Sequence, residues 1–417
     1  MKQDTKRELK PKLRFPEFRD KEGWEEYTGD RIFEQINDRN PDPNLPVLAI
    51  TQEYGAIPRD AIDYHVSVTD KSIESYKVVR VGDFIISLRS FQGGIEYSQY
   101  HGICSPAYVI LRRRIEGSNV YFKHYLKTDR FIGLLTKNLE GLRDGKMVSY
   151  KQFSELSLPV PSPTEQQRIA ECLTSLDALI AAHGQKLDAL KTHKKGLLKE
   201  LFPREGETIP RLRFPEFQGL PEWISDSLGN IFETSSGGTP ERSVKEYWNG
   251  KIPWITTSLV DFNVICNSDE FISEMGLQNS SAKLFQKKTV LIAMYGQGKT
   301  RGKVALLGIE ATTNQACAAI LPREDIDPYF VFLNLAGRYD EMRGLSNSGG
   351  QENLSQGLIK GLPFSYPNDI AEQQKISACL SSFDELITAQ TEKLEALKTH
   401  KQGLMQQLFP SPEEVEA

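Results

Sequence analysis

Several features are scarce in this chain of 417 residues, and each scarcity narrows its class. The five cysteines are scattered and form no C-x-x-C pair, which argues against a disulfide framework and against a zinc site. No stretch approaches the roughly 20 consecutive apolar residues of a membrane span. Residues 1–12 are charged and polar where a secretory signal has an apolar core. The sequence therefore predicts a reduced protein of the cytoplasm.

Signals for catalysis and for bulk charge are also weak. Net charge is −5, which gives no indication of nucleic acid, although a mildly acidic total can hide a basic surface. The six histidines form no pair with metal-ligand spacing, and no nucleophile with its base is visible. The Asn or Asp, Pro, Pro, aromatic signature of an adenine methyltransferase does not occur in the sequence. These absences favour binding over catalysis, with no metal and no catalytic residue in the chain.

An internal repeat is the strongest feature that the sequence does contain. PKLRFPEF at 11–18 returns as PRLRFPEF at 210–217, an offset of 199 residues. EQQRI at 165–169 returns as EQQKI at 372–376, and LKTHK at 190–194 returns at 397–401, both at an offset of 207. Between these echoes the halves share little sequence, which is typical of one scaffold that carries two different recognition surfaces.

The second echo lies on a pattern of two long helices. Apolar residues follow a 4-3 spacing from Ile169 to Leu201, and the same spacing runs from Ile376 to Leu408, which predicts a coiled-coil seam. Thr164 with Gln167 is expected to form a capping box at the first helix, and Asp369 with Glu372 at the second. Neither stripe fits inside a small domain, so we expect the two helices to pack on each other.

These patterns predict an α+β fold. Two similar mixed α/β domains are separated by two long helices packed as an antiparallel coiled coil, and an approximate two-fold axis relates the halves. Each domain is expected to consist of short strands followed by a helix. The predicted divisions are a first domain at 1–163, a first helix at 164–203, a second domain at 204–367, a second helix at 368–410 and a tail at 411–417.

Glycine-rich polar loops supply the predicted ligand contacts. Arg, Gln and Asn are the side chains that read base edges in the major groove, Lys binds phosphate, and glycine lets backbone N–H groups approach phosphates. An ordinary polar hairpin is the plain alternative for each loop. The predicted DNA-binding residues are Arg89, Ser90, Gln92, Tyr97, Arg143 and Lys146 in the first domain, and Tyr295, Gln297, Lys299, Arg301, Asn347 and Gln351 in the second.

A second, weaker apolar stripe recurs beside the seam of both helices. It predicts a partner-binding surface at Leu179, Leu198, Leu386 and Met405, and packing onto the chain's own domains is the alternative. The segment 296–300 also suggests a phosphate-binding loop. The G-x-x-x-x-G-K-[ST] motif that ends at Lys299 requires glycine where Ala293 stands, and a strand pattern follows where a helix should begin. A nucleotide hydrolase centred on Lys299 is therefore the minor alternative.

The whole pattern resembles the specificity subunits of type I restriction-modification systems. The resemblance rests on LRFPEF at 13–18 and its copy, GDFIIS at 82–87, SPAY at 105–108, LPVP at 158–161 before EQQ, PWITT at 253–257 and NQA at 314–316. It implies that each variable domain, a target-recognition domain in that family, reads one half of a two-part DNA sequence, while the helices hold the halves a set distance apart.

The resemblance also implies partners and their cofactors. Two modification subunits transfer methyl from S-adenosylmethionine to adenine N6, and two motor-nuclease subunits use ATP and magnesium. The chain itself would be a non-catalytic subunit that needs no cofactor and serves host defence. A standalone DNA-binding protein with the same two domains remains the main alternative.

Overall fold

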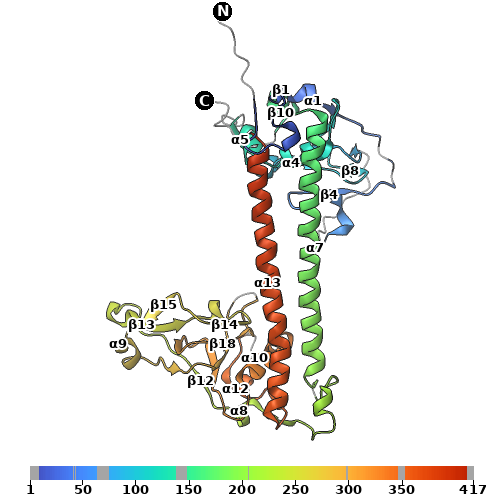
Figure 1. The fold of residues 1–417 in the computed structure, drawn as a ribbon. Coiled ribbons are helices and arrows are strands. Elements are labelled where there is room, and N and C mark those ends of the chain that lie inside the picture. The colour runs from blue at the N-terminus through green and yellow to red at the C-terminus, as the bar shows by residue number, and fades with distance from the viewer. Residues whose placement is uncertain are drawn as a thin grey trace, which may run out of the picture. The chain divides into compact units, whose positions relative to one another are not determined.

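The computed structural model of the chain describes residues 9–40, 42, 44–62, 75–137, 148–204, 206–296, 299–345 and 353–410. It divides into two compact units, Met1–Gly184 with Glu392–Ala417, and Gln185–Thr391. Two helices, α7 (Pro163–Leu201) and α13 (Ile370–Leu408), pass from one unit into the other, and both are continuous ribbons (Figure 1). Each unit therefore contains one mixed domain and one half of each long helix.

Each long helix has 39 residues, and their N-termini differ from the predicted capping boxes. α7 begins at Pro163, and the Ser162 hydroxyl accepts the backbone N–H of Glu165 at 3.3 Å, so Thr164 lies inside the first turn. Proline is preorganised for the first helical position, which moves the cap to the residue before it. In α13 Asp369 is the cap as predicted, because its carboxylate accepts the N–H of Ala371 at 2.9 Å, but Glu372 bonds Arg213 rather than returning to Asp369, so the predicted capping box is not formed.

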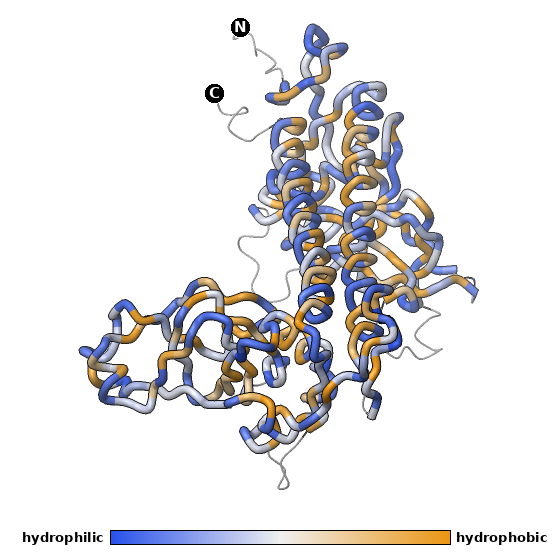
Figure 2. Tube along the Cα trace, turned by 60° about the horizontal axis from the view of Figure 1, so that its bottom comes forward, coloured by the Kyte–Doolittle hydropathy of each residue, from blue (hydrophilic) through white to orange (hydrophobic). Residues whose placement is uncertain are grey.

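The packing of α7 on α13 is antiparallel within each unit. In the first unit Asp177 of α7 pairs with Lys401 of α13, and in the second Lys194 of α7 pairs with Asp384 of α13. Asp384 and Lys401 are the repeat copies of Asp177 and Lys194. The same Asp–Lys pair therefore forms in both units, with the aspartate on α7 in the first and on α13 in the second. Apolar and polar residues alternate along both helices (Figure 2). The predicted antiparallel coiled coil is confirmed.

The first unit is built on a four-stranded antiparallel sheet in the order β2-β9-β6-β7. Buried rings fill one side of it, where the ring centroid of Phe33 lies 5.2 Å from that of Phe84 and 5.1 Å from that of Phe122. Phe409 at the end of α13 closes this core 5.5 Å from Tyr121. The strands are β1 Glu25–Thr28, β2 Phe33–Ile36, β3 Leu48–Thr51, β4 Gly55–Pro58, β5 Lys77–Val79, β6 Phe84–Ile86, β7 Glu96–Tyr97, β8 Gly102–Cys104, β9 Val109–Arg113 and β10 Ser157–Val160, and the helices are α1 Gly29–Ile32, α3 Ser90–Gly93, α4 Asn119–Tyr125, α5 Asp129–Lys137 and α6 Tyr150–Ser154.

The second unit has a five-stranded sheet, β12-β20-β17-β18-β14, and a four-stranded sheet, β15-β13-β19-β16. Its central strands are buried on both faces, which explains their continuous apolar runs. The strands are β11 Ile224–Ser227, β12 Thr234–Ser236, β13 Trp248–Ile255, β14 Asn263–Ile265, β15 Glu270–Ile272, β16 Leu284–Phe285, β17 Val290–Ala293, β18 Val304–Leu307, β19 Ala311–Thr313, β20 Cys317–Ile320 and β21 Pro363–Tyr366, and the helices are α8 Leu228–Ile231, α9 Glu274–Gln278, α10 Pro328–Gly337, α11 Tyr339–Gly344 and α12 Gln356–Lys360.

The two units share one plan, as the repeat predicts. β1 pairs with β10 in the first unit, and β11 pairs with β21 in the second. The run β2-β9-β6-β7 corresponds to β12-β20-β17-β18, and β5 pairs antiparallel with β8 as β16 pairs with β19. The parallel pairings of β13 with β19 and of β14 with β18 are reduced in the first unit to the single bridges Val47–Ile103 and Ala56–Ser98. The helix predicted after the strands is present in both, but each is broken in two, as α4 with α5 and as α10 with α11.

Candidate nucleic-acid interface

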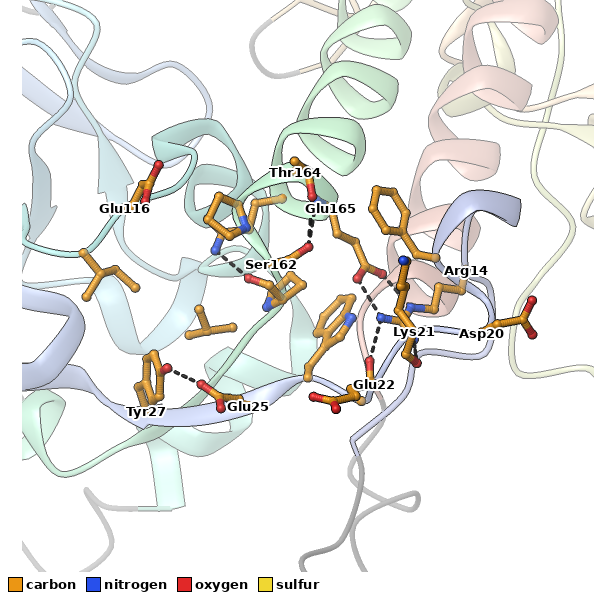
Figure 3. A pocket seen from close by; sticks show the side chains of 18 of the residues that line it. Arg14, Asp20, Lys21, Glu22, Glu25, Tyr27, Glu116, Ser162, Thr164 and Glu165 are labelled. Atoms are coloured by element: carbon orange, nitrogen blue, oxygen red, sulfur yellow. Dashed lines mark hydrogen bonds and ion pairs between the residues drawn. The ribbon is translucent and has the colours of Figure 1, made fainter.

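The two echoes of the repeat meet each other and fix each domain to a long helix. Arg14 donates from Nε and Nη2 to both carboxylate oxygens of Glu165, each at 2.8 Å, and to the backbone carbonyls of Lys21 and Glu22 (Figure 3). The pair is buried, with 8% and 2% of the two side chains exposed. A cavity of about 950 Å³ lies beside this pair. The LRFPEF motif therefore anchors the first turn of α7.

The second unit repeats this anchor. Arg213 donates to both oxygens of Glu372 at 2.8 and 2.7 Å, and Trp223 Nε1 donates to Glu372 at 3.2 Å. The following glutamine also acts in both copies: Gln166 accepts the N–H of Ser118 at 2.9 Å, and Gln373 accepts that of Asp327 at 2.7 Å. The repeated residues are thus framework, which leaves recognition to the residues between them.

Antiparallel pairing brings the predicted loop after β6 of the first domain to one edge of its sheet. Ile86 ends β6 opposite Val109, where β9 begins, so the loop after β6 leaves the sheet at that edge. The loop forms the short helix α3, with Arg89 as its N-terminal flanking residue. Arg89 and Gln92 are exposed, and their side chains make no hydrogen bond to any other described residue. Both side chains are therefore exposed at this edge of the described part of the domain.

Ser90 and Tyr97 support this loop from inside. Ser90 is fully buried, and its hydroxyl accepts the backbone N–H of Ser87 at 2.8 Å. Tyr97 is half-buried, with its ring 5.3 Å from that of Phe84. These two predicted contacts therefore lie beneath the loop surface.

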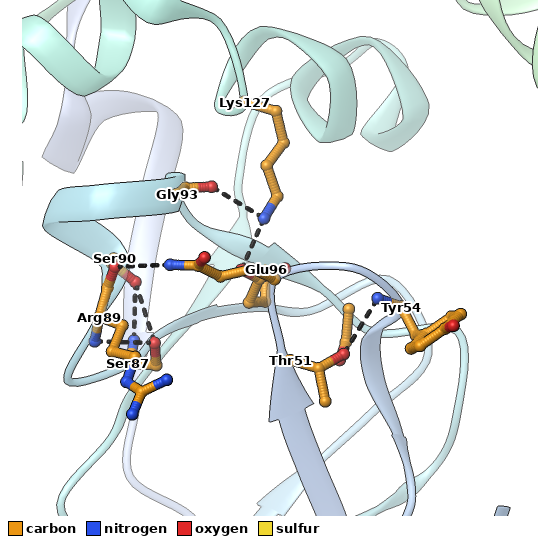
Figure 4. A network of polar contacts seen from close by, with 10 residues as sticks. Thr51, Tyr54, Ser87, Arg89, Ser90, Gly93, Glu96 and Lys127 are labelled. Atoms are coloured by element: carbon orange, nitrogen blue, oxygen red, sulfur yellow. Dashed lines mark hydrogen bonds and ion pairs between the residues drawn. The ribbon is translucent and has the colours of Figure 1, made fainter. Parts of the chain in front are cut away.

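A buried ion pair braces the same loop. Lys127 donates to Glu96 at 2.6 Å and to the backbone carbonyl of Gly93 at 2.9 Å (Figure 4). Burial raises the pKa of the Glu96 carboxyl, and the nearby Lys127 ammonium partly opposes that shift. Because Lys127 bonds both Glu96 and the end of α3, it ties the loop to the helical layer.

The second domain brings its predicted loop to the corresponding edge. Ala293 ends β17 opposite Cys317, where β20 begins, and β17 occupies the place of β6 in the shared plan. Tyr295 and Lys299 are exposed, and the backbone carbonyl of Lys299 accepts the Tyr339 hydroxyl. Arg301 is only 8% exposed and donates to the carbonyl of Arg343 at 2.9 Å, so it braces the loop.

Five predicted contacts lie outside the described residues. They are Arg143, Lys146, Gln297, Asn347 and Gln351.

Several polar residues that are not among the predicted DNA contacts also reach these edges. Gln52 follows β3 and donates to the carbonyl of Arg89 at 3.4 Å, and the neighbouring Tyr54 is 59% exposed. In the second domain the Thr239 hydroxyl donates to Gln315, and Lys303 pairs with Asp261. A polar turn between two apolar runs was the available signal for Gln52, but only strand pairing shows which turns share an edge.

The predicted partner stripe divides into two kinds of residue. Leu179 and Leu386 are 44% and 53% exposed. Leu198 and Met405 are partly buried and pack against the apolar core of their own units. Of these four residues, only Leu179 and Leu386 are exposed.

The described residues contain no cluster of His, Cys, Asp or Glu able to hold a metal ion. No described helix combines the length and apolarity that crossing a membrane requires. β18 begins at Val304, so a strand follows Lys299 at the place where a phosphate-binding loop leads into a helix.

Comparison with known proteins agrees with this architecture. The family described as the type I restriction modification DNA specificity domain matches twice, over residues 23–192 and 221–399. The chain therefore belongs to the family of type I restriction-modification DNA specificity proteins and carries two copies of its domain. The copies include all of the loops described above at the two sheet edges.

Individual relatives are more distant. The specificity subunit of the type I restriction enzyme EcoR124I/EcoR124II from Escherichia coli is 28% identical over 265 residues, which cover 60% of this chain and 61% of that protein. The chain thus matches less than two thirds of that relative's length. The S subunit of a type I restriction-modification system from M. genitalium shares the fold, with a TM-score of 0.56 at 16% identity over 97% of this chain and all of that one. A chain from a study of type I complex assembly gives 0.59 at 17% identity, over 93% and 98% of the two chains.

Proposed function

We propose that this chain reads a two-part DNA sequence, with one half-site for each domain, and that α7 with α13 sets the unread distance between the halves. The observation that carries the proposal is the equivalence of the two sheet edges. The same strand in each domain leads to a loop of exposed DNA-reading side chains, yet Arg89 and Gln92 in one edge differ from Tyr295 and Lys299 in the other. Equivalent placement with different chemistry suits two half-sites of different sequence.

The chemistry of these residues fits base and phosphate contacts. Arg and Gln make paired hydrogen bonds to guanine and adenine, Lys binds phosphate, and Tyr stacks on or hydrogen-bonds to bases. Ser90, Lys127 and Arg301 act as supports, because each is bonded to the backbone of its own domain. Preorganised supports hold the reading side chains in place before DNA arrives.

The proposed complex places catalysis outside this chain. Two modification subunits would supply methyl transfer from S-adenosylmethionine to adenine N6, and two motor-nuclease subunits would supply ATP- and magnesium-dependent cleavage, all in the cytoplasm. Leu179 and Leu386 are equivalent residues on the two long helices, so they offer two equivalent apolar docking points. Each of two identical partner subunits could therefore bind to an equivalent surface, one on each long helix.

The test is a map of adenine methylation in cells that carry the chain with its modification subunit. The variant Arg89→Ala with Gln92→Ala should relax or abolish recognition in one half of the target, and Tyr295→Ala with Lys299→Ala in the other. Each variant is the control for the other, because its remote half-site should stay unchanged. Two results would refute the assignment of one half-site to each domain. One is a target sequence that is not divided into two halves, and the other is loss of recognition at the same base pairs in both variants.

Two alternatives predict other outcomes. A standalone DNA-binding protein would bind the same target but would not co-purify with modification subunits. An ATPase centred on Lys299 would hydrolyse ATP as a purified chain and lose that activity in Lys299→Ala.

A further inference from the structure

A strained aromatic residue stands at the interface edge of the second domain. Phe262 precedes β14 and has φ of 53°, in the left-handed region that large side chains rarely adopt. Its backbone N–H donates to the carbonyl of Val304 at 2.8 Å, which fixes the turn against β18. Its side chain is 39% exposed. Asparagine or glycine would adopt this backbone with less strain, so any gain from phenylalanine at this position comes from its ring.

The ring is supported from behind. Tyr339 of α11 meets Phe262 edge-on, with 5.1 Å between ring centroids and 86° between planes. The Tyr339 hydroxyl donates to the carbonyl of Lys299 and accepts from Arg343 Nη1 at 3.0 Å. These two hydrogen bonds hold the Tyr339 ring in place, so it supports the ring of Phe262. Strained residues persist where the surrounding structure holds them, and they cluster at ligand-binding sites.

Lysine and tyrosine residues lie in the segments next to Phe262. Lys303 pairs with Asp261, the residue before Phe262, and the backbone carbonyl of the exposed Lys299 accepts the hydroxyl of Tyr339, which packs on Phe262. Tyr295 is 41% exposed on the loop after β17. The pairing β17-β18-β14 brings these positions to one sheet edge. An apolar tip among lysines fits nucleic acid, because lysine binds phosphates while the ring enters between bases.

We propose that Phe262 is a wedge that inserts into one base step of the half-site read by the second domain and unstacks it. This inference rests on the proposed function. Apolar side chains that enter a base step separate the stacked bases and bend the duplex, which adds sequence preference through the ease of unstacking. In the first domain Ala56 forms a parallel bridge with Ser98 beside β7, as β14 pairs beside β18, but the left-handed residue before that bridge is Gly55, which has no ring, so the wedge belongs to one half-site only.

The experiment uses the chain assembled with its modification subunits. Duplexes that contain the mapped target carry 2-aminopurine at successive positions of the second half-site, because this base fluoresces when it is unstacked. Wild-type complex should brighten the probe at one step besides the adenine that is methylated. Phe262→Ala should remove that signal and weaken binding by about fivefold to a hundredfold, the range for loss of one stacked base, whereas Phe262→Leu should retain part of it.

Two further variants separate the wedge from a structural role. Phe262→Asn should keep the melting temperature within about 2 °C while the signal disappears, because asparagine tolerates the left-handed turn. Val264→Ala is the matched control, since Val264 is a 43% exposed apolar residue on β14 two positions away, and it should leave the signal intact. A wild-type complex that binds its target without a second bright step, or a Phe262→Ala complex that keeps it, would overturn the wedge. Failure of the wild-type complex to bind any DNA would instead refute the proposed function.

Discussion

Replacing Arg14 by alanine should destabilise the first unit more than a surface ion pair could. The guanidinium makes two bonds of 2.8 Å to Glu165 and two of 2.9 Å to backbone carbonyls, and both charged side chains are over 90% buried. Removing one partner of a buried pair costs about 3–5 kcal/mol, because the other charge stays buried without compensation. The partial positive charge at the N-terminus of α7 stabilises the Glu165 carboxylate by up to about 1 kcal/mol, which offsets part of this cost. We therefore expect a loss of about 3 kcal/mol.

The assay is thermal and urea unfolding of the full chain. For a unit of this size a loss of about 3 kcal/mol corresponds to roughly 6–12 °C in the melting temperature of the first unit. Arg14→Met combined with Glu165→Leu should cost no more than the single change, because no unpaired charge remains. Arg168→Ala is the control, since its pair with Glu17 is about half exposed and should contribute under about 1 kcal/mol.

The reasoning would be refuted by either of two results. A loss under about 1 kcal/mol for Arg14→Ala would mean that water or another group compensates Glu165. Additive losses in the double variant would mean that the two side chains do not act as a pair. The copy offers an independent repetition, because Arg213→Ala removes the equivalent partner of Glu372 in the second unit.

Three other predictions concern the helices and their contacts. Burial, with the Lys401 ammonium, lowers the pKa of His124 to about 4, so between about pH 6.5 and 4 the unfolded chain binds a proton at this residue and the folded chain does not. The free energy of unfolding should therefore fall by about 2–3 kcal/mol as pH drops from 6.5 to 4. Urea titrations of His124→Gln should show a smaller fall over the same pH range. Lys401→Asp should weaken the helix pair by about 1–2 kcal/mol through repulsion of Asp177, and adding Asp177→Lys should restore most of the loss in a double-mutant cycle. Leu386→Glu should reduce co-purification of modification subunits without lowering the melting temperature, because that side chain is 53% exposed; unchanged capture would remove it from the docking surface.

The architecture could be predicted because it is periodic and repeated. A 4-3 stripe carried in two copies specifies a long helix and its pairing, and Pro203 and Pro410 lie just beyond the two ends. The anchoring role of LRFPEF and EQQ could not be predicted, since Arg14 and Glu165 are 151 residues apart and their meeting depends on tertiary packing. The cap at Ser162 was missed because a serine before proline and a threonine inside the turn give the same local pattern.

The places of the candidate loops along the chain could be predicted from the sequence, whereas the burial of their side chains could not. The sequence shows after which predicted strand each glycine-rich loop with Arg, Gln and Lys lies. It does not show which of these side chains are exposed and could contact DNA, and which are buried and hold the loop in place. Ser90 and Arg301 have suitable chemistry and are buried, because their bonds go to the backbone of their own domains. Phe262 carries no sequence signal, since its left-handed backbone follows from the pairing of β14 with β18.

The division of the helices between units has a consequence for synthesis. The second unit is one continuous stretch of chain, whereas the core of the first waits for Leu408 and Phe409, which a ribosome adds more than two hundred residues after Tyr121. Until then the nascent first domain exposes the aromatic surface that these residues cover. We expect it to depend on chaperones during translation, and truncation before Leu408 should send the shortened protein into aggregates rather than leave a folded first half.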